Sequence, residues 1–218
     1  MSLVFPLSLP TFWSVLPVDE PSLDLGEALQ IDRTAGGTVL IADLGERLWQ
    51  GRVTFGTLTY AEAAPVEGLL DVLRQSGRSF LCNDLRRLNP LADPSGSILG
   101  AASVTVTAIP SAREVTLGGL PAGYVLSPGD YLGWGYDGAL DRRAFHRVVD
   151  GGTASGGGAL TIEVVPTIRP GLVTGAAVVL KSPSFRAHVL PGSAERGRSR
   201  RRITEGGGFG FVQTLRQA

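Results

Sequence analysis

The sequence has almost none of the side chains from which disulfides and transition-metal sites are built. Cysteine occurs once, at Cys82, and histidine twice, at His146 and His188. One cysteine cannot form a disulfide within the chain and cannot build a multi-cysteine metal site. Two histidines are too few for a three-histidine catalytic metal site. We therefore expect no disulfide and no metal.

Long apolar segments are also missing. No stretch approaches the ~18 uninterrupted apolar residues that a membrane helix needs. Residues 1–9 are apolar, but Pro6 and Pro10 interrupt the segment and no basic residue precedes it, which is unlike a secretory signal peptide. We expect a soluble chain that is made in the cytoplasm and has no membrane partner.

The chain has no excess of either charge, with 20 basic and 20 acidic residues among 218. Net charge therefore gives no reason to expect nucleic acid or an anionic membrane as the main partner. The two ends nevertheless differ. The first sixty residues carry seven acids and three arginines, whereas residues 184–218 carry seven arginines and two glutamates. Hydrophobic residues make up 43% of the chain, which is enough for a packed core.

Thirty glycines and 14 prolines favour short strands over long helices. Residues 48–56 alternate between apolar and polar side chains and predict a half-buried strand. We expect residues 39–43 to form its upstream neighbour, with Gly45 at the turn. Apolar residues then recur at helical spacing within 61–75, where Pro65 falls in the expected first turn. The stripe consists of Val66, Leu69, Leu70 and Leu73.

A strand at 78–82 follows this helix, so the first part predicts a sheet with a helix packed on one face. Residues 95–183 instead show only short β-like runs separated by turns, which favours a small antiparallel barrel or sandwich. Its expected strands are 103–107, 114–117, 131–135, 144–149, 160–164 and 176–180. A closing strand at 185–190 returns to the first sheet. We therefore expect a mainly β fold with one main helix (α+β), in which 1–94 and 184–218 form one domain and 95–183 an inserted one.

The sequence contains no recognisable active site. His146 faces away from Phe145 on its strand, but no serine or cysteine nucleophile accompanies it, so we interpret it, like His188, as a packed or sheet-surface histidine. The glycine run at 151–158 fits neither phosphate-binding motif and predicts a mobile hairpin tip. The run at 205–210 predicts a flexible segment. We expect no cofactor and no enzymatic activity.

Two clusters are candidates for binding. Five arginines within seven residues predict a pliable loop that orders against an acidic partner; they are Arg196, Arg198, Arg200, Arg201 and Arg202. The loop lacks interleaved aromatics for base stacking, so assembly is favoured over nucleic acid. A second cluster, a candidate aromatic surface for carbohydrate, consists of Tyr131, Trp134 and Tyr136, with Tyr124 nearby. Small barrels also fill their interiors with such side chains.

Several short phrases occur together in a characteristic order. They are FPLSLP at 5–10, a tryptophan-containing strand at 48–55, GRSFL at 77–81, LSPGDYL at 126–132, FHRVV at 145–149, IEVVPTIRP at 162–170 and GAAV at 175–178. This combination, over roughly residues 3–190, resembles the distal-tail type of structural protein from the tail tip of long-tailed bacteriophages and gene transfer agents.

The resemblance implies a β-sandwich-plus-helix ring domain with an attached β-barrel module, often similar to an oligonucleotide/oligosaccharide-binding (OB) fold. It implies a hexameric ring in the virion, at the tail tip or baseplate, assembled in the host cytoplasm. The partners would be copies of itself, the tail tube protein and the hub or baseplate proteins, without specific nucleic acid. A different ring of the tail, a tail terminator, or a carbohydrate- or host-surface-binding module of the baseplate remain alternatives. A ring needs two different faces to meet, and the opposite charges of the two chain ends suit such a contact.

Overall fold

The computed structural model describes residues 3–136 and 142–215. Residues 1–2, 137–141 and 216–218 of the two expected domains therefore lie outside the described residues. Strands account for 41% of the chain and helices for 8%. The described residues contain one α-helix, α1 (Tyr60–Leu73), and one 3-10 helix, η1 (Trp13–Val15). The predicted mainly β class with one main helix is confirmed.

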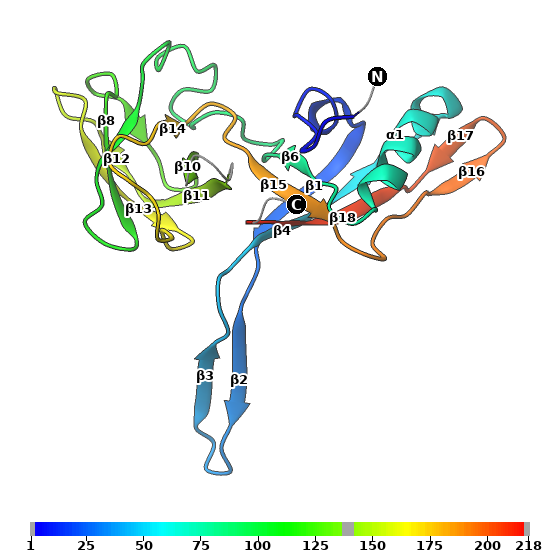
Figure 1. Cartoon of the computed structure of the whole chain (residues 1–218), viewed down its shortest axis with the longest axis horizontal. Helices are drawn as coiled ribbons and strands as arrows, with labels where there is room; N and C mark the ends of the chain where they lie inside the picture. The colour runs from blue at the N-terminus through cyan, green and yellow to red at the C-terminus, as the bar shows by residue number, and fades with distance from the viewer. Residues whose placement is uncertain (1–2, 137–141, 216–218) are drawn as a thin grey trace.

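The first sheet has five antiparallel strands, in the spatial order β1–β4–β18–β15–β6. Their bounds are β1 (Val18–Leu25), β4 (Trp49–Phe55), β18 (Gly208–Gln213), β15 (Phe185–Val189) and β6 (Phe80–Cys82). Helix α1 lies beside this sheet (Figure 1), and its buried residues Ala63, Leu70 and Leu73 join the same hydrophobic cluster as Phe55 and Phe209. The predicted sheet with a helix on one face is confirmed.

Helix α1 is capped by Thr59, whose main-chain N–H and side-chain hydroxyl both donate to Glu62 at 2.9 Å. This capping box satisfies donors that the first turn leaves unpaired. The predicted apolar stripe faces the core, with Leu70 and Leu73 buried. The expected position of Pro65 was wrong by one turn. Because the helix starts at Tyr60, Pro65 follows the first turn, and its missing N–H removes one hydrogen bond from the helix.

Residues 39–43 do form a strand, β3 (Val39–Asp43), but its predicted place beside β4 was wrong. It pairs instead with β2 (Leu29–Arg33), and the neighbour of β4 on that side is β1. The reason is the pattern of side chains. Leu23 and Leu25 of β1 alternate with exposed residues and are buried, whereas Val39, Leu40 and Ile41 are consecutive and point to both faces.

The prediction of a flexible segment at 205–210 was also wrong. It leads into β18, the central strand of the first sheet. A Cβ on Gly208 would lie 2.4 Å from the carbonyl oxygen of Val53 in β4. Glycine is therefore required here by the close approach of two backbones, and it does not mark a loop.

The second sheet has six strands, in the order β14–β10–β11–β13–β8–β7. They are β14 (Val178–Val179), β10 (Tyr131–Tyr136), β11 (Arg142–Asp150), β13 (Leu160–Val165), β8 (Glu114–Gly118) and β7 (Thr105–Ala108), with a small pair formed by β9 (Val125–Leu126) and β12 (Gly152–Thr153) beside them. Each of the six expected strands has its counterpart. The sheet curls into a half-barrel, and main-chain bonds from Val106 to Ala176 and from Val178 to Val104, both 2.9 Å, connect its two edges.

The two sheets have separate cores that meet at one place. The curled sheet surrounds its own cluster, which includes Trp134 and Leu132. Tyr131 and Phe145, although they belong to β10 and β11, pack into the core of the first sheet. The two sheets therefore share an aromatic junction, which is where the inserted strands contact the rest of the protein.

Candidate assembly surfaces

Strands β2 and β3 form a two-stranded arm that projects away from both sheets (Figure 1). Ile31 lies opposite Ile41, and the tip is closed by a bond of 2.9 Å from the N–H of Thr34 to the carbonyl of Thr38. All ten residues of the two strands are exposed. An isolated two-stranded ribbon is at best marginally stable in water, so a third element that covered this arm would stabilise it.

One face of the arm is mainly apolar. Residues opposite each other in an antiparallel pair point to the same side, so the register places four aliphatic side chains together, with Arg33 and Asp43 at the two ends of the same face: Leu29, Ile31, Val39 and Ile41. Their exposed fractions run from 47 to 64%. The opposite face carries Gln30, Asp32, Leu40 and Ala42, with a hydrogen bond of 3.1 Å from Gln30 to Asp32. Four exposed aliphatics in one row are typical of a surface that binds another protein.

The arm was not expected as a functional element. The signal was nevertheless present, because Leu29 and Ile31 alternate with polar residues, and Gly36 and Gly37 follow at hairpin spacing. What the sequence could not show is that no other part of the described chain packs on this face.

The arginine-rich segment is a second hairpin, and the predicted pliable loop was wrong. Strand β16 (Arg198–Arg200) pairs with β17 (Ile203–Glu205), and β17 pairs in turn with β5 (Leu58–Thr59). The N–H of Tyr60 donates to the carbonyl of Arg202 at 3.2 Å, which ties the hairpin to the start of α1. Main-chain hydrogen bonds within the chain hold this hairpin in place, so it can form without a partner.

The arginine side chains divide into two groups. Arg196 contacts α1, where one of its Nη atoms lies 3.0 Å from both carboxylate oxygens of Asp71. The other four are exposed, and their side chains have no ion pair or hydrogen bond within residues 3–136 and 142–215: Arg198, Arg200, Arg201 and Arg202. This hairpin therefore presents four unpaired positive charges on an ordered scaffold.

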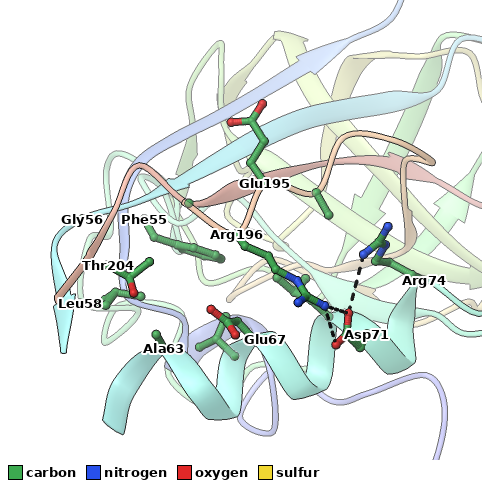
Figure 2. Close-up of a pocket in the computed structure, with 14 residues that line it drawn as sticks. Phe55, Gly56, Leu58, Ala63, Glu67, Asp71, Arg74, Glu195, Arg196 and Thr204 are labelled. Atoms are coloured by element: carbon green, nitrogen blue, oxygen red, sulfur yellow. Dashed lines mark hydrogen bonds and ion pairs between the residues drawn. The ribbon is translucent and has the colours of Figure 1, made fainter. Parts of the chain in front are cut away.

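A narrow groove lies between α1 and this hairpin (Figure 2). Its walls are mainly apolar, and Asp71 at its rim holds Arg196 and, at 3.7 Å, Arg74. The apolar lining comes from Phe55, Leu58, Ala63, Val66 and Leu70. The cavity measures about 20 Å³, which holds about one water molecule. The groove is thus a packing seam between helix and hairpin and has no room for a small-molecule ligand.

The predicted aromatic surface is buried. Tyr131 and Tyr136 are 5% exposed and Trp134 is 2% exposed. As the alternation predicts, Tyr131 and Trp134 point to opposite faces of β10, one into each core. Rings in these positions fill the interior and present no stacking surface to a sugar.

Both histidines are held by main-chain carbonyls. His146 is fully buried, stacks on Trp134 with ring centres 4.4 Å apart, and donates from Nδ1 to the carbonyl of Pro166 at 2.8 Å. Burial lowers the pKa of His146 to about 3, so its ring is neutral. His188 lies on the first sheet, with Nδ1 2.6 Å from the carbonyl of Arg78. The interpretation of His146 as a packed histidine is confirmed.

The described residues contain no group of three or more His, Cys, Asp or Glu side chains that could hold a metal ion. The same residues include no helix long and apolar enough to cross a membrane. Compared with known proteins, the sequence matches no protein-family model and no curated protein.

Proposed function

We propose that the protein is a ring-forming structural subunit of a phage-like tail tip, of the distal-tail type. In this role it joins the tail tube to the hub or baseplate and its receptor-binding apparatus. The observation that carries the proposal is the exposed apolar face of the β2–β3 arm. The order of sequence phrases described above supports the particular assembly.

In this proposal, a neighbouring copy of this chain covers the arm. Its strands and flanks, residues 27–44, carry three acids and one arginine, namely Glu27, Asp32, Asp43 and Arg33. The β16–β17 hairpin, at another place on the subunit (Figure 1), carries four unpaired arginines. Surfaces of opposite sign at different places on one subunit suit a heterologous contact, which closes into a ring when the rotation between copies closes. Such charges mainly set register and the rate of association, while the aliphatic face supplies the burial.

Within this proposal the first sheet and α1 form the ring domain, and the curled sheet is the attached OB-like barrel module. The half-barrel shape and the hydrogen bonds between its edges support the second assignment. In the assembled tip, the tail tube protein and the hub or baseplate proteins would contact the two faces of the ring. The virion is then the site of action.

The proposal is tested by two neighbouring substitutions in β3. Ile41→Asp places a carboxylate on the apolar face, whereas Leu40→Asp places the same group on the opposite face. Native mass spectrometry of the wild type should give a closed ring, with six copies expected. Ile41→Asp should shift the protein to monomers, because an unpaired carboxylate in an apolar contact is costly, and Leu40→Asp should retain the ring.

A wild-type protein that stays monomeric both free in solution and in isolated tail tips would overturn the proposal. Equal loss of the ring in both variants would show that the arm acts through its stability and not through its apolar face.

A further inference from the structure

A second concave site lies where the segment after β6 meets the curled sheet. The chain leaves the first sheet at Cys82 and passes over the turn that precedes β10, and a cleft of about 400 Å³ opens between them. Clefts of this size accommodate small molecules. Its lining is almost entirely polar and consists of Asp84, Arg86, Arg87, Gly129, Tyr131 and Arg147.

Only one of the three arginines has its charge matched inside the cleft. Arg86 forms a two-point contact with Asp84, at 3.0 and 2.9 Å, and its N–H also donates to this carboxylate. Burial alone would raise the pKa of Asp84, but these hydrogen bonds and the charge of Arg86 outweigh it and hold that pKa below its ordinary value. Asp84 is therefore ionised and already paired. No carboxylate in the cleft is left to balance the charges of Arg87 and Arg147.

Arg147 is fixed in place without a carboxylate partner. Its guanidinium lies 4.9 Å from the ring centre of Trp49 and 5.2 Å from that of Tyr131, and it donates to the Tyr131 hydroxyl at 2.8 Å. Arg87 makes one long contact, 3.4 Å to the carbonyl of Gly129. Within the described parts of the chain neither arginine forms an ion pair.

We propose that this cleft binds a multiply charged oxyanion, a phosphate or a pair of carboxylates, between Arg87 and Arg147. Two guanidiniums present planar forks of N–H donors, which match phosphate and carboxylate oxygens in pairs. Stacking on two aromatic rings orients Arg147 in advance, so little conformational entropy is lost on binding. The site is complete within one chain, and it is independent of whether the protein forms a ring.

Isothermal titration calorimetry of the full-length protein tests this, with inorganic pyrophosphate and citrate as separate probes. We expect one binding event per chain that weakens as salt rises. Stronger binding of pyrophosphate would identify phosphate as the chemistry, and stronger binding of citrate would identify carboxylates. Arg87→Gln and Arg147→Lys should each weaken binding about tenfold, the loss of a hydrogen-bonded contact to a charged group.

The matched control is Arg33→Gln, which removes the same charge from the exposed β2–β3 arm and should bind as the wild type does. Arg87 is exposed and Arg147→Lys retains the charge, so both cleft variants are expected to fold, which circular dichroism checks. The proposal is overturned if the wild type binds neither probe at millimolar concentration. It is equally overturned if either cleft variant binds as the wild type does, or if Arg33→Gln weakens binding as much as they do.

Discussion

The indole N–H of Trp49 donates a hydrogen bond of 2.7 Å to the main-chain carbonyl of Phe145. Trp49 belongs to β4 in the first sheet, and Phe145 belongs to β11 in the curled sheet. Their rings also meet edge to face, with centres 5.3 Å apart, and both residues are buried. One side chain thus links the two sheets through both an apolar contact and a hydrogen bond, so we expect them to unfold together.

Trp49→Phe should lower the free energy of unfolding by about 1–3 kcal/mol, because the Phe145 carbonyl is left buried without its donor, with a further loss from the smaller ring. Urea denaturation followed by circular dichroism measures this change. The control is Tyr60→Phe, which removes a hydroxyl from a ring that is 76% exposed and should leave stability unchanged. If the two substitutions cost the same, the hydrogen bond between the sheets contributes nothing.

Leu70→Asp should prevent soluble expression. Leu70 is buried between α1 and the first sheet, and a carboxylate there has no partner, which costs on the order of 3 kcal/mol or more. Gly68→Asp is the matched control, because Gly68 is on the exposed side of the same helix and an added Cβ meets nothing within 4 Å. The measurement is the soluble fraction after expression. Soluble, cooperatively folding Leu70→Asp protein would contradict the packing of α1 described above.

His146 should make the protein less stable as the pH falls. Burial lowers the pKa of His146 from 6.5 to about 3. Between these pH values the imidazole binds a proton in the unfolded chain but not in the folded protein. Stability is therefore complete above the unfolded pKa and declines below it, by about 2 kcal/mol at about pH 5. Burial would raise the pKa values of Asp84 and Asp93, but hydrogen bonds outweigh it and lower both from 3.8. Their contribution is thus lost only at lower pH.

Urea denaturation at about pH 7.5 and about pH 5 measures the effect. His146→Gln retains a donor for the Pro166 carbonyl but cannot titrate in this range, so its stability should change much less between the two pH values. A decline as steep as that of the wild type would assign the pH dependence to other groups.

Replacing Arg200, Arg201 and Arg202 with serine should weaken assembly. These side chains are exposed on an ordered hairpin, and an acidic surface on a neighbouring copy would attract them. The deficit should be largest at low salt and should shrink as salt rises, because screening also weakens the wild type's attraction. Sedimentation across a salt series measures it. If the hairpin binds DNA instead, the wild type should bind duplex with steeply salt-dependent affinity, and its ring should survive the substitution.

The local pattern of the sequence predicted α1 and most strands of the curled sheet well. In α1, Leu70 and Leu73 lie on one buried face, and the helical spacing of apolar residues in the sequence predicts such a face. In β10, alternation correctly separated Tyr131 from Trp134. The period does not say whether both faces of a strand are covered. Tyr131 is buried in the core of the first sheet, and Trp134 and Tyr136 are buried in the core of the curled sheet, so the burial of all three depends on two cores.

Strand pairing was harder to predict from the sequence, because it depends on residues that are far apart in the chain. The arm strand β3 is apolar enough to suggest a core, and only the position of β1 beside β4 shows that it projects. The other errors came from stretches whose composition is typical of loops. Gly208 serves a close contact between backbones, and Arg201 adopts a positive φ of 50° in the turn of a hairpin, but in sequence both stretches resemble loops.

The position of β18 between β4 and β15 constrains how the protein is made. During synthesis, β4 is made long before residues 208–213, and all strands of the curled sheet are made before them as well. The strands of the inserted sheet can therefore pair with one another before β18 has been made, whereas the first sheet closes only once β18 is present. Until then β4 keeps one unpaired edge, which is free to pair with the same edge of another nascent chain.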